Sequence, residues 1–362
     1  MTQATVAVLF GGRSSEHSIS AATAGGILSA IDRDRYRVIP VGITREGVFV
    51  LEQDDPARFA LDAAALPVVE DNGTRILWPD AGGDRMLRVQ QTDGEVTDLG
   101  EIDAVLPILH GLHGEDGTIQ GFLDILELPY AGGGVLDSAL CMDKHFMKIA
   151  LVAADVPVSK WVTVRRARWD GDEQAVRAEV DALGYPVFVK PARAGSSVGV
   201  SKAHDDSELA AAMELAFAED DKVLVEEQLV GREIEVAVLE GRDGAEARVS
   251  LPGEIVLTTR EFYDFEGKYL NGEGVEVVCP ASLSDAEIAA VREIGARAFA
   301  AVDGRGLARV DTFVAPSGEV FVNELNTMPG FTPISMYPKC WIASGLSYAD
   351  LITELIELAR AR

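Results

Sequence analysis

The sequence of 362 residues is 48% hydrophobic and 25% charged, a balance that excludes disordered and collagen-like chains. Its 59 acidic residues outnumber its 32 basic residues, and the formal net charge of −27 argues against nucleic acid and membrane surfaces as partners, since both are anionic. A small anionic ligand would therefore need a locally basic pocket. At about 150 residues per domain, the length predicts two or three domains.

Cysteine and histidine usage gives no sign of a disulfide framework or a zinc site. The three cysteines form no CxxC pair, and the five histidines form no HExxH motif. The N-terminus shows no basic segment followed by a long apolar stretch, and no apolar run approaches the ~18 residues of a membrane span. We therefore expect a cytoplasmic protein with no membrane partner.

The first third of the chain alternates apolar strands with helical stretches. Strands are expected at 5–10, 36–43 and 103–109, and a Ser/Ala-rich helix follows the first strand to about Ile31. This alternation predicts a parallel α/β sheet. Residues 52–101, which are richer in Gly, Asp and Gln, are expected to form a peripheral antiparallel excursion.

The remaining two thirds predict an α+β arrangement. Helices are expected at 135–154, 172–183, 206–218, 285–302 and 346–361. Strands are expected at 160–164, 185–190, 198–202 and 222–226, in several extended segments after Gly231, and in a hairpin at 307–325. We divide the chain into three lobes: an N-terminal α/β domain at 1–134, a central lobe at 135–228 and a third lobe at 229–362.

The hairpin carries the strongest chemical signal. Arg309 and Asp311 lie two residues apart on its first strand and share a face, as do Glu324 and Asn326 on its second. Folding the hairpin about residue 317 sets Asp311 opposite residue 323 or 324. Two carboxylates, an amide and an arginine on one face suit Mg²⁺, which fills its octahedron with phosphate oxygens and water. The alternative is a solvated face with an Arg–Glu pair.

A loop with the composition of a phosphate site joins two strands of the central lobe. Residues 190–199 offer Lys190, an arginine, two glycines and two hydroxyls, and glycines let backbone amides approach an anion. The loop is not a Walker A motif, because no GK[ST] precedes a helix. Lys144 is a second candidate phosphate lysine. The alternatives are a flexible hairpin tip and an exposed helical lysine.

Three acids follow the strand at 222–226. Glu226, Glu227 and Glu233 stand where a strand edge can offer backbone groups to a purine, while a carboxylate accepts from the 6-amino group or the ribose hydroxyls. A strand ending in solvated acids is the alternative.

Two Gly-rich loops follow strands of the first lobe, at 11–16 and 110–117, where α/β sheets bind ligands. Neither fits GxGxxG, so a dinucleotide site is disfavoured, and a structural turn stays open for the second. The aromatic and charged loop 261–269 indicates a lid over a site, with a self-packed Ω-loop as the alternative.

Taken together, the motifs resemble those of the D-alanine–D-alanine ligases of the ATP-grasp superfamily. The matching stretches follow the family's order over nearly the whole chain: LFGGRSSEHSIS, LPILHGLHGEDGTIQG, YAGGGVLDSALCMDKHFMK, VKPARAGSSVGVSK, EFYDFEGKY, ARVDTF and VNELNTMPGFTPISMYP. The resemblance implies a three-lobed ATP-grasp architecture. It also implies that ATP phosphorylates one D-alanine carboxylate and that the amine of a second D-alanine attacks the acyl phosphate, for peptidoglycan precursor synthesis.

The resemblance also implies the nucleotide and metal ligands. ATP would be bound by Lys144, Lys190, Ser197, Glu226, Glu227, Leu229 and Glu233. Two Mg²⁺ ions, replaceable by Mn²⁺, would be held by Asp311, Glu324 and Asn326. Glu226 and Glu233 would take the adenine amino group and the ribose. Arg309 would cover the transferring phosphoryl group and the oxyanion of the tetrahedral intermediate.

The amino-acid sites are implied in the same way. Glu16 would hold the ammonium of the first D-alanine and connect through Ser196 to Tyr269 on the lid. Ser335 and Lys268 would bind the carboxylate of the second. Gly330 would donate an oxyanion-hole amide, and His110 would lie near the second substrate. Whether Tyr269 acts as a base or as a lid latch stays open.

Two positions depart from the family pattern: Phe265 stands where Tyr is usual, and Glu227 where Lys occurs, so Glu227 would offer mainly backbone to adenine. Tyr269 disfavours the nearest rival activity, a D-alanine–D-lactate ligase. The intact metal and phosphoryl residues disfavour an inactive nucleotide-binding homologue. A homodimer is expected.

Overall fold

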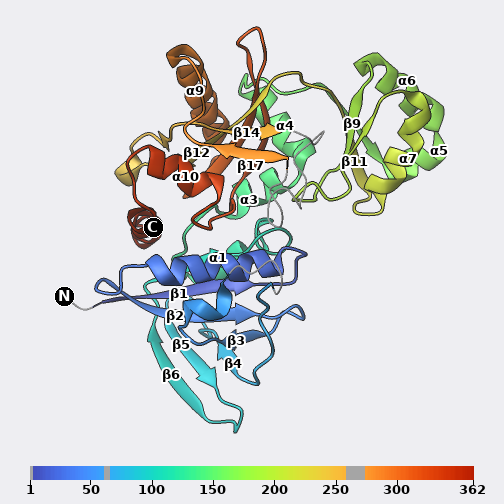
Figure 1. The fold of residues 1–362 in the computed structure, drawn as a ribbon. Coiled ribbons are helices and arrows are strands. Elements are labelled where there is room, and N and C mark those ends of the chain that lie inside the picture. The colour runs from blue at the N-terminus through green and yellow to red at the C-terminus, as the bar shows by residue number, and fades with distance from the viewer. Residues whose placement is uncertain (1–2, 61–65, 258–273) are drawn as a thin grey trace.

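The structure is a computed structural model that describes residues 3–60, 66–257 and 274–362. Figure 1 shows three lobes, each built around its own β-sheet, with the N-terminal lobe at the bottom of the view. The expected α/β start and α+β continuation are confirmed. None of the helices within the described ranges is long and apolar enough to cross a membrane.

The N-terminal lobe contains a four-stranded sheet in the order β3-β2-β1-β7. Its strands are β1 (Ala4–Gly11), β2 (Tyr36–Ile43), β3 (Phe49–Leu51) and β7 (Ala104–Ile108). β1 pairs in parallel with both β2 and β7, which confirms the predicted parallel core. The excursion is also confirmed as an antiparallel sheet of β4 (Arg75–Leu77), β5 (Met86–Gln90) and β6 (Val96–Glu101). The helical elements are α1 (His17–Ala30), η1 (Pro56–Phe59) and α2 (Thr118–Ile125).

The central sheet has the antiparallel order β10-β9-β11-β8. It consists of β8 (Trp161–Arg165), β9 (Val187–Pro191), β10 (Ser201–Ala203) and β11 (Lys222–Glu227). The helices α5 (Arg166–Gly171), α6 (Glu173–Leu183) and α7 (Asp206–Phe217) lie together beside this sheet (Figure 1). Their apolar side chains share one core with it, which includes Trp169, Val176 and Met213. The outer helices thus leave β9 and β11 facing the third lobe.

The third lobe is built on the antiparallel order β15-β14-β12-β16-β17, with β13 paired to β12. Its strands are β12 (Arg232–Leu239), β13 (Arg248–Val249), β14 (Gly253–Leu257), β15 (Val275–Val278), β16 (Leu307–Val314) and β17 (Val320–Asn326). Its helical elements are η2 (Arg242–Gly244), α9 (Asp285–Ala301), α10 (Met336–Ala343) and α11 (Tyr348–Arg360). The hairpin and the helices at 285–302 and 346–361 were expected, whereas α10 was not.

The single helix expected at 135–154 is wrong. The segment forms two helices, α3 (Val135–Met142) and α4 (Lys144–Ala153), because Asp143 adopts an extended conformation and its carboxylate accepts from the amides of His145 and Phe146. Aspartate is a favoured N-cap, so it ends one helix and starts the next. Lys144 is the first residue of α4, and its ammonium donates to the carbonyl of Ala194 in the loop between β9 and β10.

The cores show how the lobes are joined. Cys141 of α3 and Met147 of α4 belong to the core of the third-lobe sheet. Phe10 and Ile27 of the first lobe share another core with α10 and α11. Phe10 and Met328 belong to this same core, so the carboxyl end of β1 and the segment after β17 lie in one core. The lobe boundaries at 134 and 228 stay predictions.

Candidate functional site

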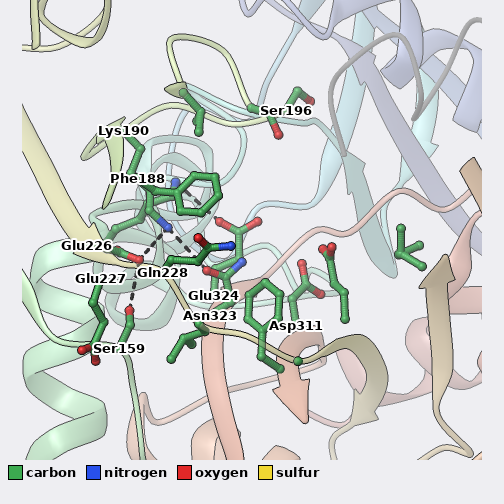
Figure 2. A pocket seen from close by; sticks show the side chains of 18 of the residues that line it. Ser159, Phe188, Lys190, Ser196, Glu226, Glu227, Gln228, Asp311, Asn323 and Glu324 are labelled. Atoms are coloured by element: carbon green, nitrogen blue, oxygen red, sulfur yellow. Dashed lines mark hydrogen bonds and ion pairs between the residues drawn. The ribbon is translucent and has the colours of Figure 1, made fainter. Parts of the chain in front are cut away.

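A cavity of about 440 Å³ lies between the central sheet and the third-lobe sheet. Figure 2 shows Lys190, Glu226 and Ser159 on one side of it, and Asp311, Asn323 and Glu324 on the other. Ser196, expected to contact Glu16, lines this cavity. So do most of the nucleotide and metal residues expected from the sequence: Lys144, Lys190, Ser197, Glu226, Glu227, Leu229, Glu233, Asp311 and Glu324. Segments between Lys144 and Glu324 thus meet at one cavity.

The hairpin register sets the acidic wall. Arg309 pairs with Asn326, and Asp311 pairs with Glu324, one of the two partners predicted for Asp311 by folding about residue 317. A β-bulge between Asp311 and the next residue shifts the pairing by one position. The extra residue is Asn323 on β17, and both Asn323 and Glu324 line the cavity beside Asp311.

Arg309 is the centre of a buried charge network on this wall. Its Nε lies 2.6 Å from Asp311 Oδ1 and 3.0 Å from Glu235 Oε2, while the amide of Asn326 donates to Asp311 Oδ2 over 3.1 Å. Burial alone would lower the pKa of the guanidinium, but Asp311 and Glu235 raise it well above its usual value. Glu235 was missed in the sequence, although it stands two residues after Glu233 on β12 and so shares its face.

Lys144 also reaches the acidic wall. Its ammonium lies 3.6 Å from Glu324 Oε2 and donates to the carbonyl of Ala194 over 2.8 Å. The side chain is mostly buried, which removes the alternative of an exposed helical lysine. The helix break at Asp143 makes this placement feasible, and Lys144 therefore joins the acidic wall to the loop at 191–199.

The acidic wall fits Mg²⁺ in its donor chemistry. Two carboxylates and an amide oxygen are hard ligands, and Mg²⁺ normally completes such a set with phosphate oxygens and water. No ready cage of three His, Cys, Asp or Glu side chains occurs in the part of the chain that the structure describes. Arg309 contacts the carboxylate of Asp311 and Lys144 that of Glu324, so each proposed carboxylate ligand has a cation beside it.

The opposite wall is organised around Glu226 of β11. Its Oε2 accepts from Lys190 at 2.9 Å and from the Ser159 hydroxyl at 3.1 Å, and its Oε1 lies 3.4 Å from Lys148. Burial alone would raise the pKa of this carboxyl, but Lys148 and Lys190 lower it below its ordinary value. Lys148 and Ser159 were missed in the sequence. The spacing of Lys148 four residues after Lys144 was the available signal.

The loop between β9 and β10 connects the cavity to the first lobe. Ser196 and Ser197 both have positive φ, of 51° and 58°, a conformation that non-glycine residues seldom adopt. In this conformation the Ser196 hydroxyl faces the first lobe and donates to Glu16 Oε1 over 2.5 Å. Two residues predicted to act together are thus in direct contact.

Around Glu16 the first lobe packs tightly against the end of β17. Glu16 is buried, and a Cβ at Gly111, which has φ +73°, would lie 2.9 Å from its Oε2. Ring nitrogen Nδ1 of His110 lies 2.9 Å from the carbonyl of Met328, and burial lowers the pKa of this imidazole, which favours its neutral form. His110 therefore joins the lobes in addition to lying near the site.

Glu115 is a further carboxyl that sequence reasoning missed. It accepts from the backbone amides of Gly111 at 2.6 Å and Met328 at 3.2 Å. Burial of the carboxyl, followed by repulsion from Glu16, raises its pKa to about 8. Its position inside a Gly-rich loop of mixed charge gave no signal that separated it from a turn residue.

The other predicted residues are placed as follows. Ser335 is the N-cap of α10, with its hydroxyl 2.7 Å from that of Thr332, and a Cβ at Gly330 would lie 3.2 Å from Ser335 Oγ. Glu227 directs its carboxylate to the backbone amide of Lys160 at 2.8 Å. Lys268, Tyr269, Phe265 and the predicted lid lie outside the described residues.

Comparison with known proteins gives the same family at the level of sequence and of fold. The family models described as D-ala D-ala ligase N-terminus and D-ala D-ala ligase C-terminus match residues 5–133 and 150–357. The D-alanine–D-alanine ligase of Kineococcus radiotolerans is 52% identical over 364 residues, covering 99% of this chain and 96% of its own. The one from Paenarthrobacter aurescens is 50% identical over 359 residues, with 99% and 95% covered.

Solved structures agree. The structure of the D-alanine–D-alanine ligase from Coxiella burnetii matches with a TM-score of 0.83 and 35% identity, covering 99% of this chain and 94% of that one. The VanG D-Ala:D-Ser ligase from Enterococcus faecalis matches with a TM-score of 0.85 and 34% identity, covering 99% and 100%.

Proposed function

Because the chain belongs to the D-alanine–D-alanine ligase family, we propose that it joins two D-alanines with ATP, through an acyl phosphate, for peptidoglycan precursor synthesis. The three-lobed ATP-grasp fold follows from the match to solved ligase structures. The observation that carries the proposal is the convergence of a lysine-rich wall and an acid-rich wall on one cavity, since the reaction must bring a phosphate and a carboxylate together.

The nucleotide is assigned to the side of the cavity formed by the central lobe. Lys190 and Lys144 supply positive charge to the phosphates, and the backbone amides of the loop around Ser197 can approach them. Glu226 accepts from the adenine amino group, and Glu233 on β12 accepts from the ribose hydroxyls. Leu229 and Glu227 border the base, with Glu227 contributing its backbone while its side chain stays on the Lys160 amide.

The metal is assigned to the acidic wall, as two Mg²⁺ ions replaceable by Mn²⁺. Asp311, Glu324 and Asn326 would hold them, with phosphate oxygens completing the coordination. Bound there, the ions neutralise the phosphates so that the substrate carboxylate can approach. Arg309, anchored by Asp311 and Glu235, remains positioned to stabilise the transferring phosphoryl group and the later oxyanion.

The amino acids are assigned to the side of the first lobe. Glu16 binds the ammonium of the first D-alanine, and Ser196 holds Glu16 and connects it to Tyr269, which closes the site against water. Ser335 and Lys268 bind the carboxylate of the second D-alanine, the amide of Gly330 donates to the oxyanion, and His110 borders this substrate. Proximity of the two amino acids then supplies much of the rate, because the amine attacks within a preassembled site.

A D-serine or D-lactate acceptor is the second candidate. The structural match to a D-Ala:D-Ser ligase, at 34% identity, favours the D-serine acceptor. The curated D-alanine–D-alanine ligases that this chain matches share about half of its residues, so D-alanine is the acceptor that we propose.

The test is the joint measurement of ADP and dipeptide with ATP, Mg²⁺ and D-alanine. We expect one D-alanyl-D-alanine per ADP, and little ADP with L-alanine or no amino acid. D-Serine and D-lactate, each added with D-alanine, give the acceptor preference. Equal turnover with L-alanine, or none with either enantiomer, would overturn the ligase assignment.

We further propose a cytoplasmic homodimer. Exposed apolar side chains on α4, at Phe146, Ile149 and Val152, support a subunit interface, since large apolar groups in a row are rarely left to water. The cytoplasm supplies ATP, and the acidic surface favours no nucleic-acid partner. Sedimentation at several protein concentrations tests the dimer.

A further inference from the structure

Lys148 has a buried ammonium that the proposed mechanism leaves without a role. It lies on α4 one turn beyond Lys144, and its side chain is fully buried. Its Nζ donates to the Ser159 hydroxyl at 2.8 Å, lies 3.4 Å from Glu226 Oε1 and sits 5.6 Å over the ring of Trp161. An isolated buried charge is costly. The ammonium of Lys148 is therefore stabilised by its pairing with the carboxylate of Glu226.

The two lysines that contact Glu226 are not equivalent. Lys190 lines the cavity and lies within 3.4 Å of the Asn323 side-chain oxygen, so its ammonium is accessible to a phosphate. Lys148 is absent from the cavity wall and is enclosed behind Glu226. A phosphate that attracts Lys190 therefore removes one partner of Glu226 and leaves Lys148 in place.

The charge of Glu226 decides which base it can accept. An ionised carboxylate only accepts hydrogen bonds, so it matches the 6-amino group of adenine and repels the 6-keto oxygen of guanine. A protonated carboxyl can donate to that oxygen. Burial favours the protonated form of Glu226 whenever its cations are lost.

On these contacts we propose that Lys148 is a positioning residue that keeps Glu226 ionised and oriented while Lys190 serves the nucleotide phosphates, and so sets the preference for adenine over guanine. The proposal rests on the proposed function, because it takes Glu226 as the adenine-binding carboxylate. The charged groups that face Glu226 are Lys148 from α4, Lys190 from β9 and its neighbour Glu227 on β11. The Ser159 hydroxyl links Lys148 to Glu226, because it accepts from the ammonium and donates to Oε2.

The test is calorimetric binding of ADP and GDP, with Mg²⁺, to the full-length protein and its Lys148→Met variant at about pH 6 and pH 8. The readout is the ratio of the dissociation constants for ADP and GDP. Because the two nucleotides carry the same phosphates, the effect of phosphate protonation on binding cancels in this ratio. For the wild type we expect a strong ADP preference that is the same at both pH values. For Lys148→Met we expect the preference to fall about tenfold at the lower pH and less at the higher pH.

Two further variants keep the outcome decisive. Ser159→Ala, which removes one hydrogen bond from Glu226, gives a smaller shift in the same direction and serves if Lys148→Met does not fold. Lys222→Met removes another buried lysine of the same lobe, which pairs with Asp143, and should leave the ratio unchanged. An unchanged ratio in Lys148→Met and Ser159→Ala, with ADP bound by the wild type, overturns this proposal alone. A wild-type protein that bound no ADP and made no dipeptide would overturn the proposed function and this proposal with it.

Discussion

The two walls of the cavity have opposite arrangements of buried charge. On the third-lobe wall one guanidinium, Arg309, is surrounded by the carboxylates of Asp311, Glu235 and Glu324. On the central wall two ammonium groups flank one carboxylate, Glu226. The first wall has negative charge to offer a divalent cation, and the second has positive charge to offer phosphate. In a protein with a net charge of −27, the positive charge proposed to bind the phosphates thus comes from a local, mostly buried cluster of lysines.

The largest effect should come from weakening the acidic wall. Glu324→Gln withdraws one charge from the proposed metal site, and losing one preorganised electrostatic group typically costs ~10²–10³ in rate, or about 2.7–4 kcal/mol. Steady-state dipeptide formation at saturating Mg²⁺ measures it. Glu319→Gln, at the exposed tip of the same hairpin, is the matched control and should retain full activity. Wild-type turnover in Glu324→Gln would mean that this face holds only a structural charge network and no metal.

A smaller effect is expected where the central wall meets the first lobe. Ser196→Ala removes the hydrogen bond to Glu16, so KM for D-alanine should rise about tenfold while ATP affinity stays near the wild-type value. Some acyl phosphate should be lost to water, which separates phosphate release from dipeptide formation. Tyr269→Phe should give a similar defect, and the double variant should be less than additive. Additive losses with one phosphate per dipeptide would contradict a linked Glu16–Ser196–Tyr269 chain.

Glu115 is a buried carboxyl whose surroundings differ from those of Glu226. Glu226 has two ammonium partners and a lowered pKa, whereas Glu115 has only backbone amides and a pKa of about 8, above the ordinary 4.5. Because the folded state binds this proton more tightly than the unfolded state, the stability it adds is complete below about pH 4.5 and is lost as the pH rises through 8. Thermal unfolding should therefore show that the Tm of the wild type falls, relative to the Tm of Glu115→Gln, as the pH is raised from about 4.5 to about 8. Parallel Tm curves for the two proteins would refute this protonation state.

The smallest effect is expected at Glu227, at the border of the lysine-rich wall. Its carboxylate contacts the backbone amide of Lys160 and lies 4.0 Å from an ammonium that is largely exposed, and exposed pairs contribute roughly 0–1 kcal/mol. Glu227→Lys should consequently change the ATP dissociation constant by less than about threefold. A change of tenfold or more would show that the side chain, and not the backbone, meets the nucleotide.

The sequence indicated the acidic wall more completely than the lysine wall, for a physical reason. Arg309, Asp311, Glu324 and Asn326 lie on one hairpin, so alternation and turn position were enough to predict their shared face. The bulge, which brings Asn323 to the cavity as well, was not predicted. The partners of Glu226 come from a helix, a loop and a strand that are far apart in the chain. No local periodicity brings such groups together.

The strands of the first lobe were also predictable, because buried β-strands read as short apolar runs. The break at Asp143 was missed because apolar residues continue on both sides of it, and only the local capping hydrogen bonds reveal it. Tyr269 and Lys268 lie outside the described residues, so their roles stay predictions.

The most direct test of the two-wall account is the binding of Mn²⁺ to wild type and Glu324→Gln, with and without ADP. The account predicts that ADP strengthens Mn²⁺ binding in the wild type, because phosphate oxygens complete the coordination begun by the acidic wall. In Glu324→Gln this ADP-dependent Mn²⁺ binding should weaken at least about tenfold, while metal-free ADP binds as in the wild type. Equal Mn²⁺ affinity in the two proteins in the presence of ADP would contradict the assignment of the metal to this wall.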